Sequence, residues 1–190
     1  ICIQLLGSQN DMATIRLLLR ENIPYKVIGS FYFYNRKEIK DLIAYMKLIY
    51  NPKDDTSLLR IINTPKRGIG AKTIEHLTEK ARIEGTSLFD AIESGKEMQF
   101  KQLIETLIAE KDNSSLTELV DLILSQSGMR EELESEKSME ADIRLENLEE
   151  FKTITKNFEE RNGIISLDEF LMEISLVTDI EEHKNRTDVV

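Results

Sequence analysis

Apolar residues after Ser30 recur at spacings of three and four along almost the whole chain, and few stretches alternate as a strand would. This periodicity lines apolar side chains along one stripe of a helix, so successive helices must pack their stripes together. Asp54 and Asp55 are expected to accept hydrogen bonds from the first amides of the helix that follows them. The spacing predicts a mainly α fold. Helices are expected over 38–49, around 58–62, and over 71–84, 87–92, 100–110, 116–125, 129–136, 141–158 and 167–177. A loose polar tail is expected after residue 178.

The N-terminal residues follow a different pattern. An apolar strand over 1–6, a helix over 11–21 and a second strand over 25–28 form a strand, helix, strand unit. Such a unit needs neighbouring strands to bury both of its faces, and the rest of the chain offers almost none. We therefore expect an α/β remnant that belongs to another domain of a longer protein.

Charge is distributed unevenly along the sequence. The formal net charge is −10, which disfavours a protein that coats nucleic acid over its whole surface, because phosphates need local positive charge. Four basic residues and no acid occur between Arg60 and Lys72, whereas residues 131–160 are crowded with carboxylates. The basic run is a candidate anion site, although either run also fits a solvated helix face.

Patterns that carry catalysis are missing. The chain has no phosphate loop and no dinucleotide-type glycine fingerprint, so we expect it not to hydrolyse ATP by itself and predict no catalytic residue or cofactor. The single cysteine, Cys2, cannot form an internal disulfide. The two histidines, His76 and His183, lack partners at metal-ligand spacing, which predicts no metal site. The charged content of 32% and the absence of a long apolar run predict a soluble, cytoplasmic chain without a membrane span.

The segment Leu58–Leu77, LLRIINTPKRGIGAKTIEHL, is the most informative one. Two apolar helices are joined by a turn in which Gly68 and Gly70 flank Ile69. Glycine permits a positive φ and a close approach to a ligand, while Ile69 would anchor the turn to the core.

The helix that begins near Ala71 would direct free amides and the positive end of its dipole out of this turn, which is an arrangement that favours phosphate. Lys66, Arg67 and Lys72 surround these amides. The pattern predicts contacts with the sugar-phosphate backbone that hold a duplex without reading its sequence. It also fits a tight turn that only joins two packed helices.

Several short signatures follow one another in a fixed order. They are Ile23-Pro24-Tyr25, Phe33-x-x-Arg36-x-Glu38-Ile39-Lys40-Asp41, Asn51-Pro52, Asp54-Asp55, Thr64-Pro65-x-Arg67-Gly68-Ile69-Gly70, Ser127-Gly128-Met129-Arg130 and Arg144-Leu145-Glu146-Asn147-Leu148-Glu149-Glu150-Phe151. Together they resemble the junction between domains 2A and 2B, and later blocks of 2B, in UvrD/PcrA/Rep-type superfamily 1 ATP-dependent DNA helicases.

The resemblance implies a parent with two RecA-like motor domains that hydrolyses ATP with Mg²⁺, moves 3′ to 5′ along single-stranded DNA and serves DNA repair or replication. It divides the chain into a remnant of motor domain 2A over 1–35, a helical accessory domain 2B over 36–180 and a polar tail leading back toward 2A over 181–190. The implied partners are duplex DNA at a single-strand/double-strand junction, the parent's own motor domains and a repair or replication protein.

In that family 2B swivels and touches duplex DNA ahead of the fork. The residues that the resemblance implies as duplex contacts are Thr64, Lys66, Arg67, Gly68, Ile69, Gly70 and Lys72. Those that it implies on the hinge side are Gly29, Ser30, Arg36, Glu38 and Lys40.

Two positions depart from the family pattern. The stretch Leu5–Met12 lacks both arginines of the family's Y-R-[ST]-N-A-Q-S-R turn, so the resemblance extends no nucleic-acid or nucleotide-linked role to it. Ser30 replaces a usual second glycine, which should change hinge flexibility more than binding.

Two alternatives remain open. One is a protein-interaction or autoinhibitory helical module that docks through the acidic residues 131–160 without binding DNA. The other is the equivalent region of an AddA/RecB-type helicase-nuclease, although the compact glycine turn favours the simpler helicase.

Overall fold

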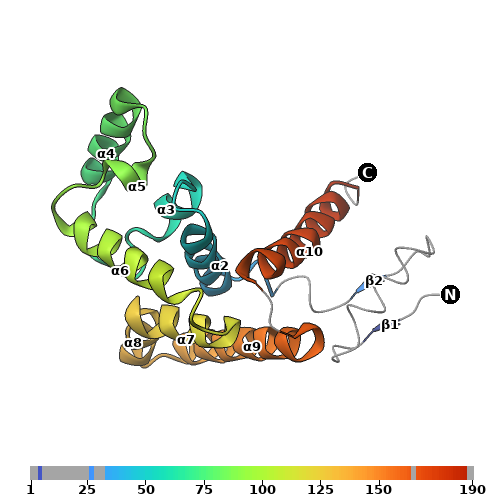
Figure 1. Cartoon of the computed structure of the whole chain (residues 1–190). Helices are drawn as coiled ribbons and strands as arrows, with labels where there is room; N and C mark the ends of the chain where they lie inside the picture. The colour runs from blue at the N-terminus through green and yellow to red at the C-terminus, as the bar shows by residue number, and fades with distance from the viewer. Residues whose placement is uncertain (1–3, 6–25, 28–32, 164–165, 188–190) are drawn as a thin grey trace. The chain divides into compact units, whose positions relative to one another are not determined.

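The computed structural model describes residues 4–5, 26–27, 33–163 and 166–187, and its contacts divide the chain into two compact units. One unit comprises Ile1–Arg36 with Leu176–Val190, and the other, the helical unit, comprises Lys37–Ser175. The described part is mainly α, as the periodicity predicted (Figure 1). Its elements are β1 Gln4–Leu5, β2 Lys26–Val27, α2 Lys37–Tyr50, α3 Asp55–Ile61, α4 Ala71–Glu84, α5 Leu88–Ala91, α6 Lys96–Glu110, α7 Leu116–Gln126, α8 Met129–Glu136, α9 Met139–Asn162 and α10 Leu167–Thr187.

β1 and β2 form a parallel pair in which Gln4 lies opposite Lys26 and Leu5 opposite Val27. They are the two strands expected at the ends of the N-terminal unit. The helix expected over 11–21 and the glycine-serine pair at 29–30 lie outside the described residues.

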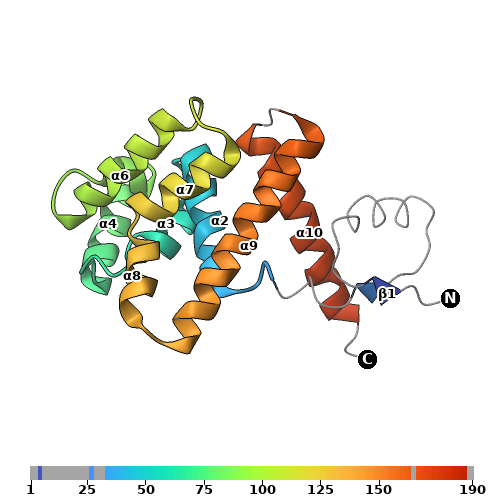
Figure 2. The ribbon, with the colours of Figure 1, turned by 90° about the horizontal axis from the view of Figure 1, so that it is seen from below.

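Helix α2 forms the centre of the helical unit, and α3, α6, α7 and α9 pack round it (Figures 1 and 2). Ten of its fourteen residues are buried, because apolar side chains occupy almost every face rather than one stripe. It ends at Tyr50, one residue beyond the predicted end at residue 49, and Asn51-Pro52 follows.

Two carboxylates of α2 are buried and both have partners. Glu38 accepts a hydrogen bond from the Nδ2 of Asn147 on α9 at 2.6 Å, across 109 residues of sequence. Asp41 pairs with Arg60 of α3 at 2.8 Å. Burial raises the pKa of Asp41, and the Arg60 guanidinium opposes this rise. These pairs satisfy the charges that α2 carries into the core and fix the register of α3 and α9 against it.

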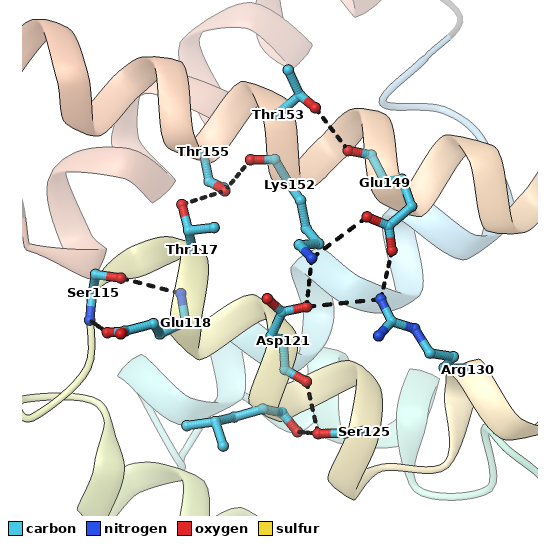
Figure 3. Close-up of polar contacts among 11 residues, drawn as sticks. Ser115, Thr117, Glu118, Asp121, Ser125, Arg130, Glu149, Lys152, Thr153 and Thr155 are labelled. Carbon is cyan, nitrogen blue, oxygen red and sulfur yellow. Dashed lines mark hydrogen bonds and ion pairs between the residues drawn. The ribbon is translucent and has the colours of Figure 1, made fainter.

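Polar contacts join α7, α8 and α9 along their outer side (Figure 3). The Asp121 carboxylate of α7 forms an ion pair with the Lys152 ammonium of α9 at 2.8 Å. The Arg130 guanidinium of α8 forms another with the Glu149 carboxylate of α9 at 2.5 Å. The amide of Leu116, at the start of α7, donates to a Glu159 carboxylate oxygen of α9 at 2.5 Å. These contacts hold the α7–α8 corner in place, and that corner lies beside the turn described below.

Three local predictions were wrong. Residues 179–187, expected in a loose tail, continue α10 as helix; they include Glu, Lys and Arg, which favour helix, and no glycine or proline. Helix α6 begins at Lys96, a full turn earlier than expected, since Gly95 serves as its N-cap. Asp54 caps α3 by accepting a hydrogen bond from the Ser57 amide, as predicted. Asp55, expected to do the same for α3, accepts a hydrogen bond from the Leu88 amide of α5 instead.

None of the helices in the described ranges combines the length and the apolar character that a membrane crossing requires.

Replacing Asn147 with alanine should lower the free energy of unfolding of the helical unit by about 1–3 kcal/mol, because the buried Glu38 carboxylate loses its donor. Urea denaturation followed by circular dichroism measures the change. Gln102→Ala, on an exposed site of α6, is the control and should change stability by less than about 0.5 kcal/mol. Equal stability of Asn147→Ala and wild type would contradict this role of the pair.

Candidate nucleic-acid interface

The turn between α3 and α4, residues 62–70, is held by its own side chains. The Oδ1 of Asn63 accepts hydrogen bonds from the amides of Arg67 at 2.8 Å and Ile69 at 3.2 Å. Ile69 is buried, which confirms that it anchors the turn to the core. The side chain of Ile69 is therefore enclosed, and only its backbone could contribute to a duplex contact.

Arg67 points its guanidinium into the protein and not toward solvent. It donates to the carbonyl oxygens of Ile61 at 3.1 Å, Pro65 at 3.2 Å and Ser127 at 2.9 Å, and to the Tyr45 hydroxyl at 2.7 Å. Its Cζ also lies 5.4 Å from the centre of the buried Phe100 ring. These contacts tie the turn to α2, α6 and the α7–α8 corner. A phosphate contact by Arg67 remains a prediction, and the observed partners are internal.

The two glycines adopt different conformations. Gly68 has φ +71°, the left-handed region that the sequence predicted. Gly70 does not share it, since its φ of −91° and ψ of 173° are extended. Gly70 is instead the N-cap of α4, and no side chain caps that helix end. A larger residue than glycine at the N-cap could cover the first amides of α4, whereas Gly70 leaves the approach to them open.

The basic run predicted from Arg60 to Lys72 separates into two pairs in three dimensions. Arg67 is bonded inside the protein and Arg60, although 38% exposed, pairs with the buried Asp41, whereas Lys66 and Lys72 are exposed and form no ion pair among the described residues. An acidic side chain also lies beside the basic run, although none occurs within it in the sequence. The Glu132 carboxylate of α8 accepts a hydrogen bond from the Lys66 amide at 3.4 Å. Local charge at the turn is thus decided by neighbours from other helices.

Lys96 joins the turn from α6, which sequence reasoning missed. Its Nζ would lie 2.7 Å from a Cβ built on Gly68, so the ammonium rests over that glycine. Among the residues that the structure describes, no ion pair involves Lys66, Lys72 or Lys96. Sequence reasoning placed the start of this helix at residue 100, and nothing in the sequence related Lys96 to residue 68.

Thr64 contributes mainly to the frame of the turn. It is half-buried, its carbonyl accepts from the Tyr45 hydroxyl at 2.7 Å, and its own hydroxyl donates to the Arg60 carbonyl at 3.3 Å. This hydroxyl bond lies at an exposed position, so the Thr64 side chain is reachable from solvent although it is paired with its own chain.

The predicted hinge residues fall into three groups. Gly29 and Ser30 lie outside the described residues. Arg36 is exposed, in a bend at the last position of the first segment of its unit, with its Cζ 5.4 Å from the Phe33 ring centre. Glu38 is buried against Asn147, and Lys40 is exposed on α2.

In the described ranges no group of histidine, cysteine, aspartate or glutamate side chains could hold a metal ion. His76 is exposed on α4, as expected, and the side chain of His183 is not among those described.

Stability should fall as the pH rises from about 10 toward 12, because burial raises the pKa of Tyr45 to about 12 while an unfolded tyrosine ionises near 10. Between these two pKa values the folded state keeps the Tyr45 phenol protonated, whereas the unfolded chain releases the proton. Tyr45 therefore favours unfolding only at a pH above the pKa of the unfolded tyrosine. Urea denaturation at several alkaline pH values measures the trend. Tyr45→Phe should remove about 2–3 kcal/mol of this pH dependence, whereas the exposed Tyr50→Phe should leave it unchanged.

Residues 3–190 match the family of the UvrD-like helicase C-terminal domain. The protein "ATP-dependent DNA helicase PcrA" of Bacillus subtilis is 43% identical over 176 residues, which cover 87% of this chain and 24% of that protein. The proteins of the same name from Staphylococcus epidermidis and Staphylococcus aureus are 43% and 41% identical over 177 residues. These residues cover 86% of this chain and 24% of each of those proteins. The chain thus spans about a quarter of the length of these relatives. A match along nearly all of its residues, with this level of identity, shows that the chain belongs to the UvrD-like helicase C-terminal domain family.

Proposed function

We propose that the chain is a duplex-DNA-contacting, swivelling regulatory region of an ATP-dependent DNA helicase that moves 3′ to 5′ and acts in DNA repair or replication. Residues 36–180 would be its accessory domain 2B, flanked by parts of motor domain 2A over 1–35 and toward 181–190. Family membership and relatives named as ATP-dependent DNA helicases support the parent activity. ATP and Mg²⁺ would be used by parts of the parent beyond these residues.

The observation that carries the DNA contact is a preformed, exposed turn with an open helix end and three lysines. Gly68, Gly70 and the start of α4 present backbone, while Lys66, Lys72 and Lys96 supply positive charge. Amides and ammonium groups bind phosphate oxygens and carry no information about base identity, so the contact would be independent of sequence. The internal bonds of Arg67 keep the turn in one shape, which reduces the entropy lost on binding.

The swivelling part of the proposal is supported by where the two compact units divide. One division falls between Arg36 and Lys37, next to the predicted hinge residues, and the other between Ser175 and Leu176 inside α10. Only two backbone connections would then change direction when the domain turns.

Exchanging Lys66 and Lys72 for glutamine should weaken duplex binding and reduce its salt dependence, because each lost phosphate contact lowers the slope of log K against log salt by about 0.9. Lys96→Gln should lower the slope by a further step of the same size. The measurement is fluorescence anisotropy of a labelled hairpin duplex, titrated with the purified chain at several sodium chloride concentrations.

Lys53→Gln with Lys156→Gln makes the same change of net charge on exposed positions away from the turn, and should leave the slope unchanged. An equal effect of this control pair would mean that overall charge, and not the turn, determines binding. Duplex binding that is insensitive to the turn lysines would overturn the assignment of the turn.

Glu132→Gln should strengthen duplex binding roughly threefold, an effect of the size usual for one exposed charge. The Glu132 carboxylate accepts a hydrogen bond from the Lys66 amide, and a phosphate oxygen would compete with it for that amide. Glutamine keeps an acceptor but removes the negative charge. The same hairpin titration at low salt tests this, and weaker binding by the variant would contradict a competing role for Glu132.

A further inference from the structure

Helix α9 exposes two large apolar side chains in its first two turns. Met139 is 83% exposed and Ile143 is 52% exposed. They are four residues apart on one helix, so they lie one turn from each other on the same side. Single exposed apolar residues are common on soluble proteins, and these two lie close enough along the helix for one partner to cover both.

Acidic side chains share this side of the helix. Asp142 and Glu146 follow Met139 by three and seven residues, which places them beside the apolar pair. Glu150 continues the row one turn further along. Within the described residues, no ion pair involves any of these three carboxylates, although Glu149 on a neighbouring face pairs with Arg130.

The opposite side of the same helix faces the core. Ala141 and Leu148 are buried there. The buried Asn147, which donates a hydrogen bond to Glu38 of α2, follows Ile143 by four residues, so the exposed apolar row ends one turn after Ile143. The orientation of α9 is therefore fixed, and the apolar and acidic face is directed away from the core of the helical unit. Figure 2 shows the α8–α9 corner, where this face begins, at the outer edge of that unit.

We propose that this face docks a basic amphipathic helix of a partner protein. Residues 131–150 contain nine carboxylates and two cations, so lysine or arginine side chains would be attracted to the face and phosphate-bearing partners repelled. Met139 and Ile143, one turn apart, supply an apolar strip of the kind that receives anchors at the same spacing. The flexible thioether of Met139 can adapt to more than one apolar anchor.

This interaction is separate from the proposed DNA contact. The turn over residues 62–70 offers positive charge and exposed backbone, whereas the α9 face offers negative charge and apolar surface. A single partner surface would not suit both. The DNA-contacting function and the docking of a basic helix can therefore stand or fall independently.

The test uses an 18-residue fluorescein-labelled peptide of lysine, leucine and alanine, with leucines spaced to form one face of a helix. Fluorescence anisotropy at 0.15 M sodium chloride measures its binding to the full chain. A peptide of the same composition, with leucines scattered round the helix, is the control for net charge. The patterned peptide should bind at least about tenfold more tightly than the scattered one.

Met139→Ser with Ile143→Ser should reduce binding of the patterned peptide by about tenfold or more, and Asp142→Asn with Glu146→Gln should reduce both its affinity and its salt dependence. Ile83→Ser, at another exposed apolar position, and Glu105→Gln with Glu110→Gln, which remove two charges elsewhere, should change little. All of these sites are exposed, so circular dichroism should show unchanged folding. Equal binding of the two peptides, equal losses in the control variants, or no binding by wild type would overturn the proposal.

Discussion

The guanidinium of Arg67 joins segments that are far apart in the sequence. It donates to Tyr45 on α2, to its own turn and to Ser127 at the α7–α8 corner, and it stacks near Phe100 of α6. A planar group with five donors suits this task, because several carbonyls can be satisfied at once at fixed angles. The exposed backbone of the turn takes its shape from these internal bonds, so the proposed DNA-contacting surface depends on an arginine that does not itself point outward.

Polar bonds across the core join the signature blocks of the family at two places. Glu38 of one block accepts from Asn147 of another, and Arg67 of a third reaches Ser127 of a fourth. Residues that look like isolated polar motifs along the chain are therefore partners across the core. Buried polar groups need such partners, because an unsatisfied donor or acceptor costs more than the pair contributes.

Charge acts locally in this protein. The chain as a whole is strongly acidic, yet Lys66, Lys72 and Lys96 lie at one turn, while Asp142, Glu146 and Glu150, which form no ion pair with any described residue, lie on the exposed face of α9. Interactions between exposed charges decay within about 10 Å at ordinary salt. Two surfaces of opposite character can consequently coexist on one helical unit and favour different partners.

The sequence by itself determined the succession of helices, the anchoring of Ile69 and the family resemblance, because these depend on periodicity and on residues close in the chain. It missed the early start of α6 and the continuation of α10, where weak end signals gave no warning. Only the tertiary structure decided which cations are free. Arg60 and Arg67 look like their lysine neighbours in the sequence, and Lys96 lies 28 residues from Gly68. Their roles follow from which helices pack together, and long-range packing places the acceptors that engage the arginines and leave the lysines exposed.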